Sequence, residues 1–332
     1  MGIHNFLKLL FEDHNDLLVY KSFNHLKNKI IGIDANNIIY DAMTSLIKKN
    51  KNVLNNDGQE VYHIYAILEI IYKFSKNKMK PLFIFDGEPS ELKTDKVKER
   101  KVDKKESNDT LKIINEAIIE GKEKELTEEQ KEYIKSKTKM KELKIRSLKF
   151  GCKEQKEVLE ILDLYKIPYI KCVGEADITC GYLSKHGIVD YILTNDSDIL
   201  CFGAKKIILS FFLRGQIVEI DIERIKKKFN IDQDIFLESC LMMGTDYNKS
   251  TGMTFEAIIR LLKTYKGMEI LRKNIPHLFV KDFDYKRVKD YYHSDPKNKE
   301  EMIKRYTWEI EDKKSINNEI CEKFRITMIN EI

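Results

Sequence analysis

Short apolar runs that stop at an acidic residue constrain this chain of 332 residues more than any other feature. Residues 29–33 form one such run and are followed by Asp34, and residues 81–85 form another that is followed by Asp86. A further run, residues 191–194, leads into the sequence Asn-Asp-Ser-Asp. Runs of about four to eight apolar residues bounded by turn-forming residues are typical of buried strands. The sequence therefore predicts several strands that end at carboxylates.

Helical patterns separate these runs. Residues 62–74 carry apolar side chains at helical spacing, and residues 93–165 contain no proline and only two glycines. Further strands are predicted at residues 167–172 and 207–212, and the chain after about residue 221 is expected to be all helical. Strands that alternate with helices indicate an α/β fold with a mostly parallel central sheet flanked by helices. In such sheets ligands bind beyond the carboxyl ends of the strands.

An acidic set lies at these strand ends and at predicted helix starts. Its members are Asp34, Asp86, Glu175, Asp177, Asp196, Asp198 and Asp246. A single aspartate at a strand end is more often a helix N-cap or a turn residue than a ligand. Several carboxylates at one edge of a sheet are different, because Mg²⁺ prefers oxygen ligands and two such ions carry out phosphodiester hydrolysis. The chain contains no serine-nucleophile, P-loop or zinc-protease motif that would offer another chemistry.

The basic excess of the chain is confined to one segment. Residues 93–149 contain 18 lysines and arginines against 13 acidic residues, and this difference equals the formal net charge of the whole chain, +5. A local basic excess indicates a polyanionic partner such as nucleic acid. A solvated helix of mixed charge is an equally good interpretation of the composition alone.

Six cysteines without a C-x-x-C pair indicate neither a zinc site nor a disulfide framework. Several stand among apolar residues, as expected for buried thiols in a reducing compartment. No apolar run is long enough to span a membrane, and the start of the chain lacks a signal-peptide pattern. We therefore expect an intracellular protein without a membrane partner, in the nucleus or at a cytoplasmic replication site.

Six motifs resemble flap endonucleases and the related XPG-type 5′ nucleases in order, spacing and context. They are Met1–Ile3, Ile33–Ala35, Phe85–Pro89, Gly174–Asp177, Thr194–Gly203 and Met243–Tyr247. The resemblance runs from residue 1 to about residue 325. It implies a PIN-like nuclease core with a helical arch and a helical subdomain that carries a helix–two-turn–helix. The implied regions are an N-terminal nuclease region 1–92, the arch 93–150, an internal nuclease region 151–220 and the helical subdomain 221–332.

The resemblance also implies roles for individual residues. All seven acidic residues match metal-binding carboxylates for two Mg²⁺ ions, which Mn²⁺ can replace, although Asp177 stands where the family usually has glutamate. Lys93 and Arg100 match a catalytic basic pair that contacts the scissile phosphate. The implied DNA-binding residues are Gly2, Tyr40, Arg146, Lys149 and Gly252. The alternatives are an ion-paired helix face with Asp95 and Glu99 for the basic pair, and a core aromatic for Tyr40.

Two features depart from the family pattern. The arch region is longer by well over a dozen residues, around residues 108–129, which either extend its helices or add a loop. The loop at residues 248–257 keeps only Gly252 and Ala257 of the pattern that binds K⁺ and the downstream duplex. We therefore expect weaker duplex binding there and leave K⁺ binding open. No sliding-clamp peptide is found.

These features together predict a monomeric, metal-dependent hydrolase of DNA. The leading hypothesis is a structure-specific 5′ flap endonuclease with 5′ exonuclease activity in replication and repair, with branched or flapped DNA as its partner. The alternatives are a 5′ exonuclease, an excision-repair endonuclease or a Holliday-junction resolvase of the same superfamily, a non-catalytic scaffold that binds branched DNA, and an RNA nuclease.

Overall fold

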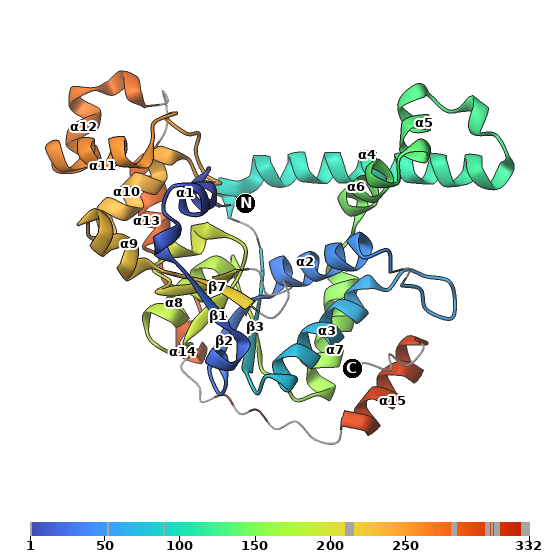
Figure 1. Cartoon of the computed structure of the whole chain (residues 1–332). Helices are drawn as coiled ribbons and strands as arrows, with labels where there is room; N and C mark the ends of the chain where they lie inside the picture. Colours follow the sequence, from blue (N-terminus) through green and yellow to red (C-terminus); the bar gives the residue numbers. More distant parts are fainter. Residues whose placement is uncertain are drawn as a thin grey trace. The chain divides into compact units, whose positions relative to one another are not determined.

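The computed structural model describes residues 2–51, 53–88, 90–209, 216–279, 284–302, 306, 308 and 313–326. The chain divides into two compact units, each built from segments that are far apart in the sequence (Figure 1). The first comprises Met1–Ile38, Tyr72–Leu92 and Lys166–Glu309, and the second comprises Ile39–Ile71, Lys93–Tyr165 and Ile310–Ile332. All seven carboxylates of the predicted metal site belong to the first unit, whereas both predicted basic pairs and Tyr40 belong to the second.

In the described part of the first unit, seven strands form one mixed sheet. The strands are β1 (Leu18–Ser22), β2 (Ile30–Asp34), β3 (Lys80–Phe85), β4 (Tyr169–Lys171), β5 (Tyr191–Leu193), β6 (Lys206–Leu209) and β7 (Gln216–Asp221). Their order is β1-β7-β6-β5-β2-β3-β4. The strands from β6 to β4 run parallel, and β7 is antiparallel to both β6 and β1.

The prediction of a mostly parallel sheet flanked by helices is confirmed. The five predicted strands correspond to β2 through β6, except that residues 210–212 lie outside the described residues. The antiparallel strands β1 and β7 were not predicted. Both carry polar side chains that hide them in the sequence, and β7 buries Glu219 because Lys21 on β1 binds its carboxylate at 2.7 Å. A buried carboxylate persists in a strand when such a partner is present.

The parallel strands end level with one another. Asp34 at the end of β2 lies opposite Ile84 on β3, and Ile33 lies opposite Leu193, the last residue of β5. The central strands are almost wholly buried, as parallel strands covered on both faces are. Helix α8 (Ala176–Lys185) packs against these three strands. The residues that follow β2, β3 and β5 therefore share one edge of the sheet.

The remainder of the first unit is helical, as predicted for the chain after residue 221. Its helices are α1 (Phe6–Glu12), α9 (Ile222–Phe229), α10 (Gln233–Met243), α11 (Phe255–Thr264), α12 (Met268–Asn274), α13 (Tyr285–Tyr292) and α14 (Lys299–Met302). The ring of Phe6 meets those of Phe236 and Phe255 edge to face, with centroids 5.9 and 5.7 Å apart. This contact fixes the N-terminal helix on the C-terminal helices, because all three rings are fully buried.

The second unit is built from helices. They are α2 (Ala35–Lys48), α3 (Tyr62–Lys76), α4 (Thr94–Glu120), α5 (Glu128–Lys135), α6 (Lys137–Ser147), α7 (Cys152–Leu164) and α15 (Lys313–Phe324). The first residues of α2 and the last residues of α3 belong to the first unit. In residues 108–129, where additional arch residues are expected, α4 continues to Glu120 and ends at Gly121 in the left-handed conformation, and a 3₁₀ turn, Glu123–Glu125, leads to α5. Ile114, Leu126 and Leu143 form a small core of their own between these helices.

All six cysteines are free thiols, in agreement with the absence of a predicted disulfide framework. Over the described part of the chain, every helix is too short or too polar to cross a bilayer.

Candidate functional site

Thr194, which follows β5, connects the carboxylate of Asp34 with the backbone of Asp196. The Thr194 hydroxyl donates a hydrogen bond of 2.8 Å to Asp34 Oδ2, and it accepts one of 3.0 Å from the Asp196 backbone N–H. Asp34 and Asp196 are buried, and Thr194 is fully buried. The residue gave no signal of its own in the sequence other than its position before the D-x-D motif. It fixes the end of β2 to the turn after β5.

The turn after β5 is closed by its own acidic residues. The Asp198 N–H donates to Asp196 Oδ1 at 2.9 Å, so Asp196 caps the short 3₁₀ helix η5 (Ser197–Leu200). Asp196 is therefore an N-cap residue, and the capping bond is made by its Oδ1 atom. Asp198 is 1% exposed. Burial of an ionised carboxylate is costly in free energy unless a partner compensates its charge.

The ends of β3 and β4 form a clasp held by three hydrogen bonds. The Gly87 N–H donates to the Gly174 carbonyl at 2.8 Å, the Ala176 N–H donates to Asp86 Oδ1 at 2.8 Å, and the Ser90 N–H donates to Glu175 Oε1 at 3.1 Å. Asp86 is exposed and Glu175 is buried. Backbone amides thus orient both carboxylates, which come from segments about ninety residues apart in the chain.

Replacement of Gly87 by alanine is expected to open this clasp. A Cβ atom at Gly87 would lie 2.1 Å from the Cys172 carbonyl oxygen and 2.9 Å from the Val173 carbonyl carbon, and backbone atoms cannot rotate away. We expect a loss of about 1–3 kcal/mol in the free energy of unfolding, as for an overpacked site. Urea denaturation measures this loss.

The matched control is Gly174→Ala, on the opposite side of the same clasp. A Cβ atom there meets nothing within 4 Å, so its free energy of unfolding should stay within about 0.5 kcal/mol of the wild type. Equal losses in the two variants would contradict the steric explanation.

The N-terminus lies against the turn after β5. The Ile3 N–H donates to Ser197 Oγ at 3.0 Å, and Gly2 adopts a φ of +97°. A Cβ atom on Gly2 would fall 2.4 Å from Asp196 Oδ1. The structure therefore brings Gly2 to the predicted metal site, in a conformation and a space that suit glycine.

Asp246 arrives on a turn after α10 that is bound to two other parts of the site. The His4 N–H donates to the Gly244 carbonyl at 2.8 Å, and the Tyr247 hydroxyl donates to Glu175 Oε2 at 2.9 Å. Asp246 itself is half-buried. Tyr247 belongs to a motif noted in the sequence, but its contact with Glu175 had no sequence signal, because the two residues are 72 positions apart.

The carboxylates of this edge repel one another. The pKa of Asp34 is raised well above its usual value, mainly by burial and then by the charges of Asp177, Asp86 and Asp196. A bound cation stabilises a cluster of negative charges that would otherwise repel one another. Mg²⁺ and Mn²⁺ prefer ligand sets made of oxygen atoms. The donor set therefore fits the predicted ions.

The described residues contain no group of three or more His, Cys, Asp or Glu side chains already gathered around one ion position. The carboxylates border a region instead of converging on a point. Mg²⁺ keeps several of its waters when it binds, so a site of this kind is compatible with ions held partly through water.

Comparison with known proteins agrees with this arrangement. The sequence matches the XPG N-terminal domain over residues 1–107 and the XPG I-region over residues 166–246. These two segments contain the first six carboxylates and end on the seventh. The chain belongs to the flap endonuclease/XPG-type nuclease family.

Relatives of this family span more than the present chain. Flap endonuclease 1 of Theileria parva is 26% identical over 303 residues, which are 88% of this chain and 56% of that protein. Flap endonuclease 1-B of Oryza sativa subsp. indica is 25% identical over 87% of this chain and 68% of its own length. Flap endonuclease 1 of Plasmodium yoelii yoelii is matched over 58% of its length. The chain therefore spans little more than half the length of the Theileria and Plasmodium proteins.

Solved structures of the family share the fold. The catalytic core of Rad2 in complex with a DNA substrate superposes with a TM-score of 0.67 at 21% identity, covering 97% of this chain and 95% of that catalytic core. Flap endonuclease-1 from Methanococcus jannaschii gives a TM-score of 0.64 at 20% identity, with 95% and 94% coverage. The PIN-like nuclease core predicted for this chain is therefore its fold.

The predicted phosphate contacts of this family member lie at α4. Lys93 is the residue before the helix and is half-buried, and Arg100 is exposed one to two turns later. The alternative interpretation pairs them with Asp95 and Glu99, and the side chain of Asp95 lies outside the described residues. The roles of Lys93 and Arg100 remain predictions.

The other predicted DNA-binding residues of the second unit lie on α2 and around α6. The Tyr40 hydroxyl donates to the Ile145 carbonyl at 2.8 Å, and its ring is half-buried. Burial raises the pKa of Tyr40. Arg146 and Lys149 are exposed, and Lys149 lines a cavity of about 500 Å³. The hydrogen bond of the hydroxyl fixes the Tyr40 ring, which is only half-buried. This position is compatible both with stacking on a base and with a packing role in the core.

The altered loop before α11 satisfies its own amides. The Gly252 N–H donates to Ser250 Oγ at 3.0 Å, and the Ala257 N–H donates to Thr254 Oγ1 at 3.4 Å. Gly252 has a φ of +77°. These two amides already donate to side-chain oxygens. A phosphate would therefore have to displace those oxygens in order to accept hydrogen bonds from the same amides. Weaker duplex binding at Gly252 remains a prediction.

Proposed function

We propose that this chain hydrolyses phosphodiester bonds in DNA that carries a 5′ single-stranded flap, with an accompanying 5′ exonuclease activity. The observation that carries the proposal is the placement of carboxylates after three parallel strand ends at one edge of the sheet, where Asp34 is buried and bonded to Thr194. Its relatives named flap endonuclease 1 support the same activity. The net basic segment from Lys93 to Lys149 supports a polyanionic substrate.

In this proposal two Mg²⁺ or Mn²⁺ ions are held by the seven carboxylates, directly or through water. When bound, such a pair activates the attacking water and stabilises the leaving oxygen of the phosphodiester. Asp34 and Asp196 are held in place by Thr194, and Asp86 and Glu175 by the backbone amides of the clasp. This pre-organisation reduces the cost of orienting the ligands as the substrate arrives.

Residues outside the carboxylate set bind the substrate. Arg100 offers two parallel hydrogen bonds to the scissile phosphate, and Lys93 supplies a compact positive charge as negative charge develops there. The Tyr40 ring stacks on an unpaired base without reading its identity. Selection of a flapped substrate then depends on backbone shape and charge, with no base-specific contact.

One comparison of substrates tests the proposal. Purified protein is incubated with labelled flap, nicked, gapped and four-way-junction DNA, and with a flapped RNA, in Mg²⁺ or in EDTA. We expect incision at the base of the 5′ flap in Mg²⁺ only. Preferred symmetric cutting of the four-way junction would replace the proposal by junction resolution, and binding without cutting in Mg²⁺ and in Mn²⁺ would replace it by a scaffold role.

A further inference from the structure

An aromatic cluster joins the C-terminal helices to one carboxylate of the candidate site. The ring of Tyr247 lies 5.2 Å from that of Tyr291 and 5.4 Å from that of Tyr292, both edge to face. Tyr291 and Tyr292 end helix α13. Both also contact the ring of Phe202, at 5.8 and 4.6 Å. We call these four residues the tyrosine cluster.

One hydroxyl of the tyrosine cluster, that of Tyr247, binds a carboxylate of the candidate site. The Tyr247 hydroxyl donates to Glu175 Oε2, whereas Glu175 Oε1 accepts from the Ser90 N–H. A hydrogen bond to each oxygen fixes the plane of the carboxylate. Each oxygen still has a second lone-pair direction that can face an ion or an ion-bound water. Oriented carboxylates bind ions more tightly, because outer-shell hydrogen bonds hold the ligand in its binding geometry.

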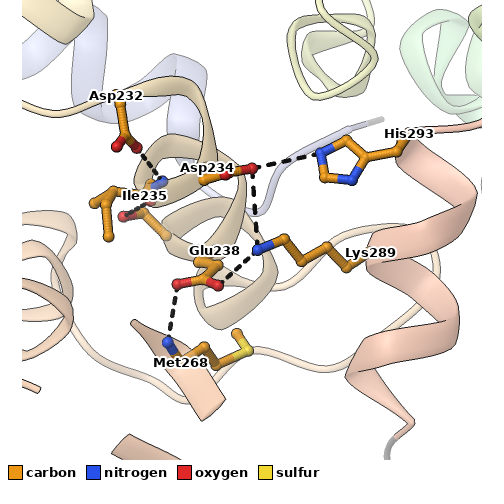
Figure 2. A network of polar contacts seen from close by, with 8 residues as sticks. Asp232, Asp234, Ile235, Glu238, Met268, Lys289 and His293 are labelled. Atoms are coloured by element: carbon orange, nitrogen blue, oxygen red, sulfur yellow. Dashed lines mark hydrogen bonds and ion pairs between the residues drawn. The ribbon is translucent and has the colours of Figure 1, made fainter. Parts of the chain in front are cut away.

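Helix α13 is itself tied to α10 and α12 by a polar network (Figure 2). Lys289 Nζ lies 2.8 Å from Glu238 Oε1, and Glu238 Oε2 accepts the Met268 N–H at 2.9 Å. Asp234 adds contacts of 4.0 Å with Lys289 and 3.6 Å with His293. Glu238 is 7% exposed, so removal of its partner leaves a buried charge. Lys289 is within one turn of the two tyrosines, and the network fixes that turn.

We propose that Tyr247 is a positioning residue that orients Glu175 for ion binding, and that α13 holds Tyr247 in place through Tyr291 and Tyr292. The inference rests on the proposed function, because it needs an ion at the carboxylates. It goes beyond that function in giving the helical subdomain a part in the site.

Binding of Mn²⁺ to the purified protein, measured by isothermal titration calorimetry, tests the inference without any cleavage step. Tyr247→Phe removes the hydroxyl and keeps the ring, and we expect it to weaken Mn²⁺ binding by about tenfold. The matched control is Tyr306→Phe. The Tyr306 hydroxyl donates to a backbone carbonyl, that of Met302, so Mn²⁺ binding in that variant should be unchanged. Circular dichroism melts check that each variant is folded.

A double-mutant cycle separates positioning from general loosening of the fold. In a Glu175→Gln background, Tyr247→Phe should weaken Mn²⁺ binding by less than about twofold, because its effect passes through Glu175. Tyr291→Leu keeps the Tyr247 hydroxyl but removes a ring contact, and we expect a loss of about two- to fivefold. An unchanged affinity in Tyr291→Leu would remove α13 from the inference.

The outcomes distinguish the inference from the function on which it rests. A wild-type protein that cleaves flapped DNA and binds Mn²⁺, with equal affinity in Tyr247→Phe, overturns the inference alone. An equal loss in both backgrounds also overturns it, since the effect would not depend on Glu175. A wild-type protein that neither binds Mn²⁺ nor cleaves overturns the proposed function, and the inference falls with it.

Discussion

Asp34→Asn is expected to lower the rate of flap cleavage by at least about 10³-fold. The substitution keeps the shape of the side chain and an oxygen that can accept the hydrogen bond from Thr194, but it removes the charge of a buried carboxylate that the proposal assigns to the ions. Single-turnover cleavage of a labelled flap in saturating Mg²⁺ measures the effect. Affinity for the flapped DNA, measured by fluorescence anisotropy in EDTA, should change little, because the predicted DNA contacts are elsewhere.

The control for this prediction is Asp190→Asn at the opposite end of the same sheet. Asp190 precedes β5, accepts the Ile30 N–H at 2.8 Å and pairs with Lys29 at 3.0 Å. It lies at the amino end of the strands, where ligands of parallel sheets do not bind. Its cleavage rate should stay within about twofold of the wild type. A similar loss in both variants, or full activity in Asp34→Asn, would refute the metal-site assignment.

Asp34→Asn is also expected to raise the melting temperature in EDTA at neutral pH, by roughly 2–5 °C. The pKa of Asp34 in the folded chain lies well above its usual value of 3.8, chiefly because of burial and then because of neighbouring carboxylates. Above that raised pKa the residue is ionised in both states, and its charge destabilises the fold. Replacement by neutral asparagine removes this penalty while the other six carboxylates stay. Differential scanning calorimetry measures the shift.

The pH dependence gives this stability prediction its sign. As the pH falls through the raised pKa, folded wild-type protein binds a proton that the unfolded chain does not yet bind, so the wild type gains stability relative to the variant. The difference in melting temperature should therefore shrink as the pH approaches about 4. A variant that melts below the wild type at every pH would contradict the repulsion argument.

Mg²⁺ should reverse the order of stability between the two proteins. An ion that binds only the folded state raises its melting temperature, and the wild type has the complete carboxylate set. We expect a large rise for the wild type and a small one for Asp34→Asn. On this argument the ion-free fold is less stable because of the carboxylates that bind the ions. Such a loss of stability is common where function requires like charges close together.

The sequence predicts the central strands well because their signal is local. Residues 30–33 and 81–85 are continuous apolar runs, and parallel strands buried on both faces show no other pattern. The antiparallel strands β1 and β7 escape prediction because each mixes polar and apolar side chains over a short length. Their pairing is decided by contacts between residues almost two hundred positions apart.

The predicted arch, residues 93–150, illustrates the same division. The composition of residues 93–165 predicts helices, and the structure has them. Whether the added residues extend those helices or form a loop could not be decided from composition. In the structure Ile114, Leu126 and Leu143 pack together, a contact that stabilises α4 and α6 against the turn between α4 and α5.

By itself the sequence determined which residue types the candidate site contains and at which edge of the sheet they gather. Apolar runs that end at acids are sufficient for that, because parallel strands present their carboxyl ends to one side. Only the tertiary structure decided how the carboxylates are held: Thr194 between Asp34 and Asp196, the clasp that orients Asp86, and Tyr247 on Glu175. Apart from the local bond between the Asp196 N–H and Thr194, these hydrogen bonds join residues distant in the chain. Their geometry follows from packing, which local sequence patterns do not encode.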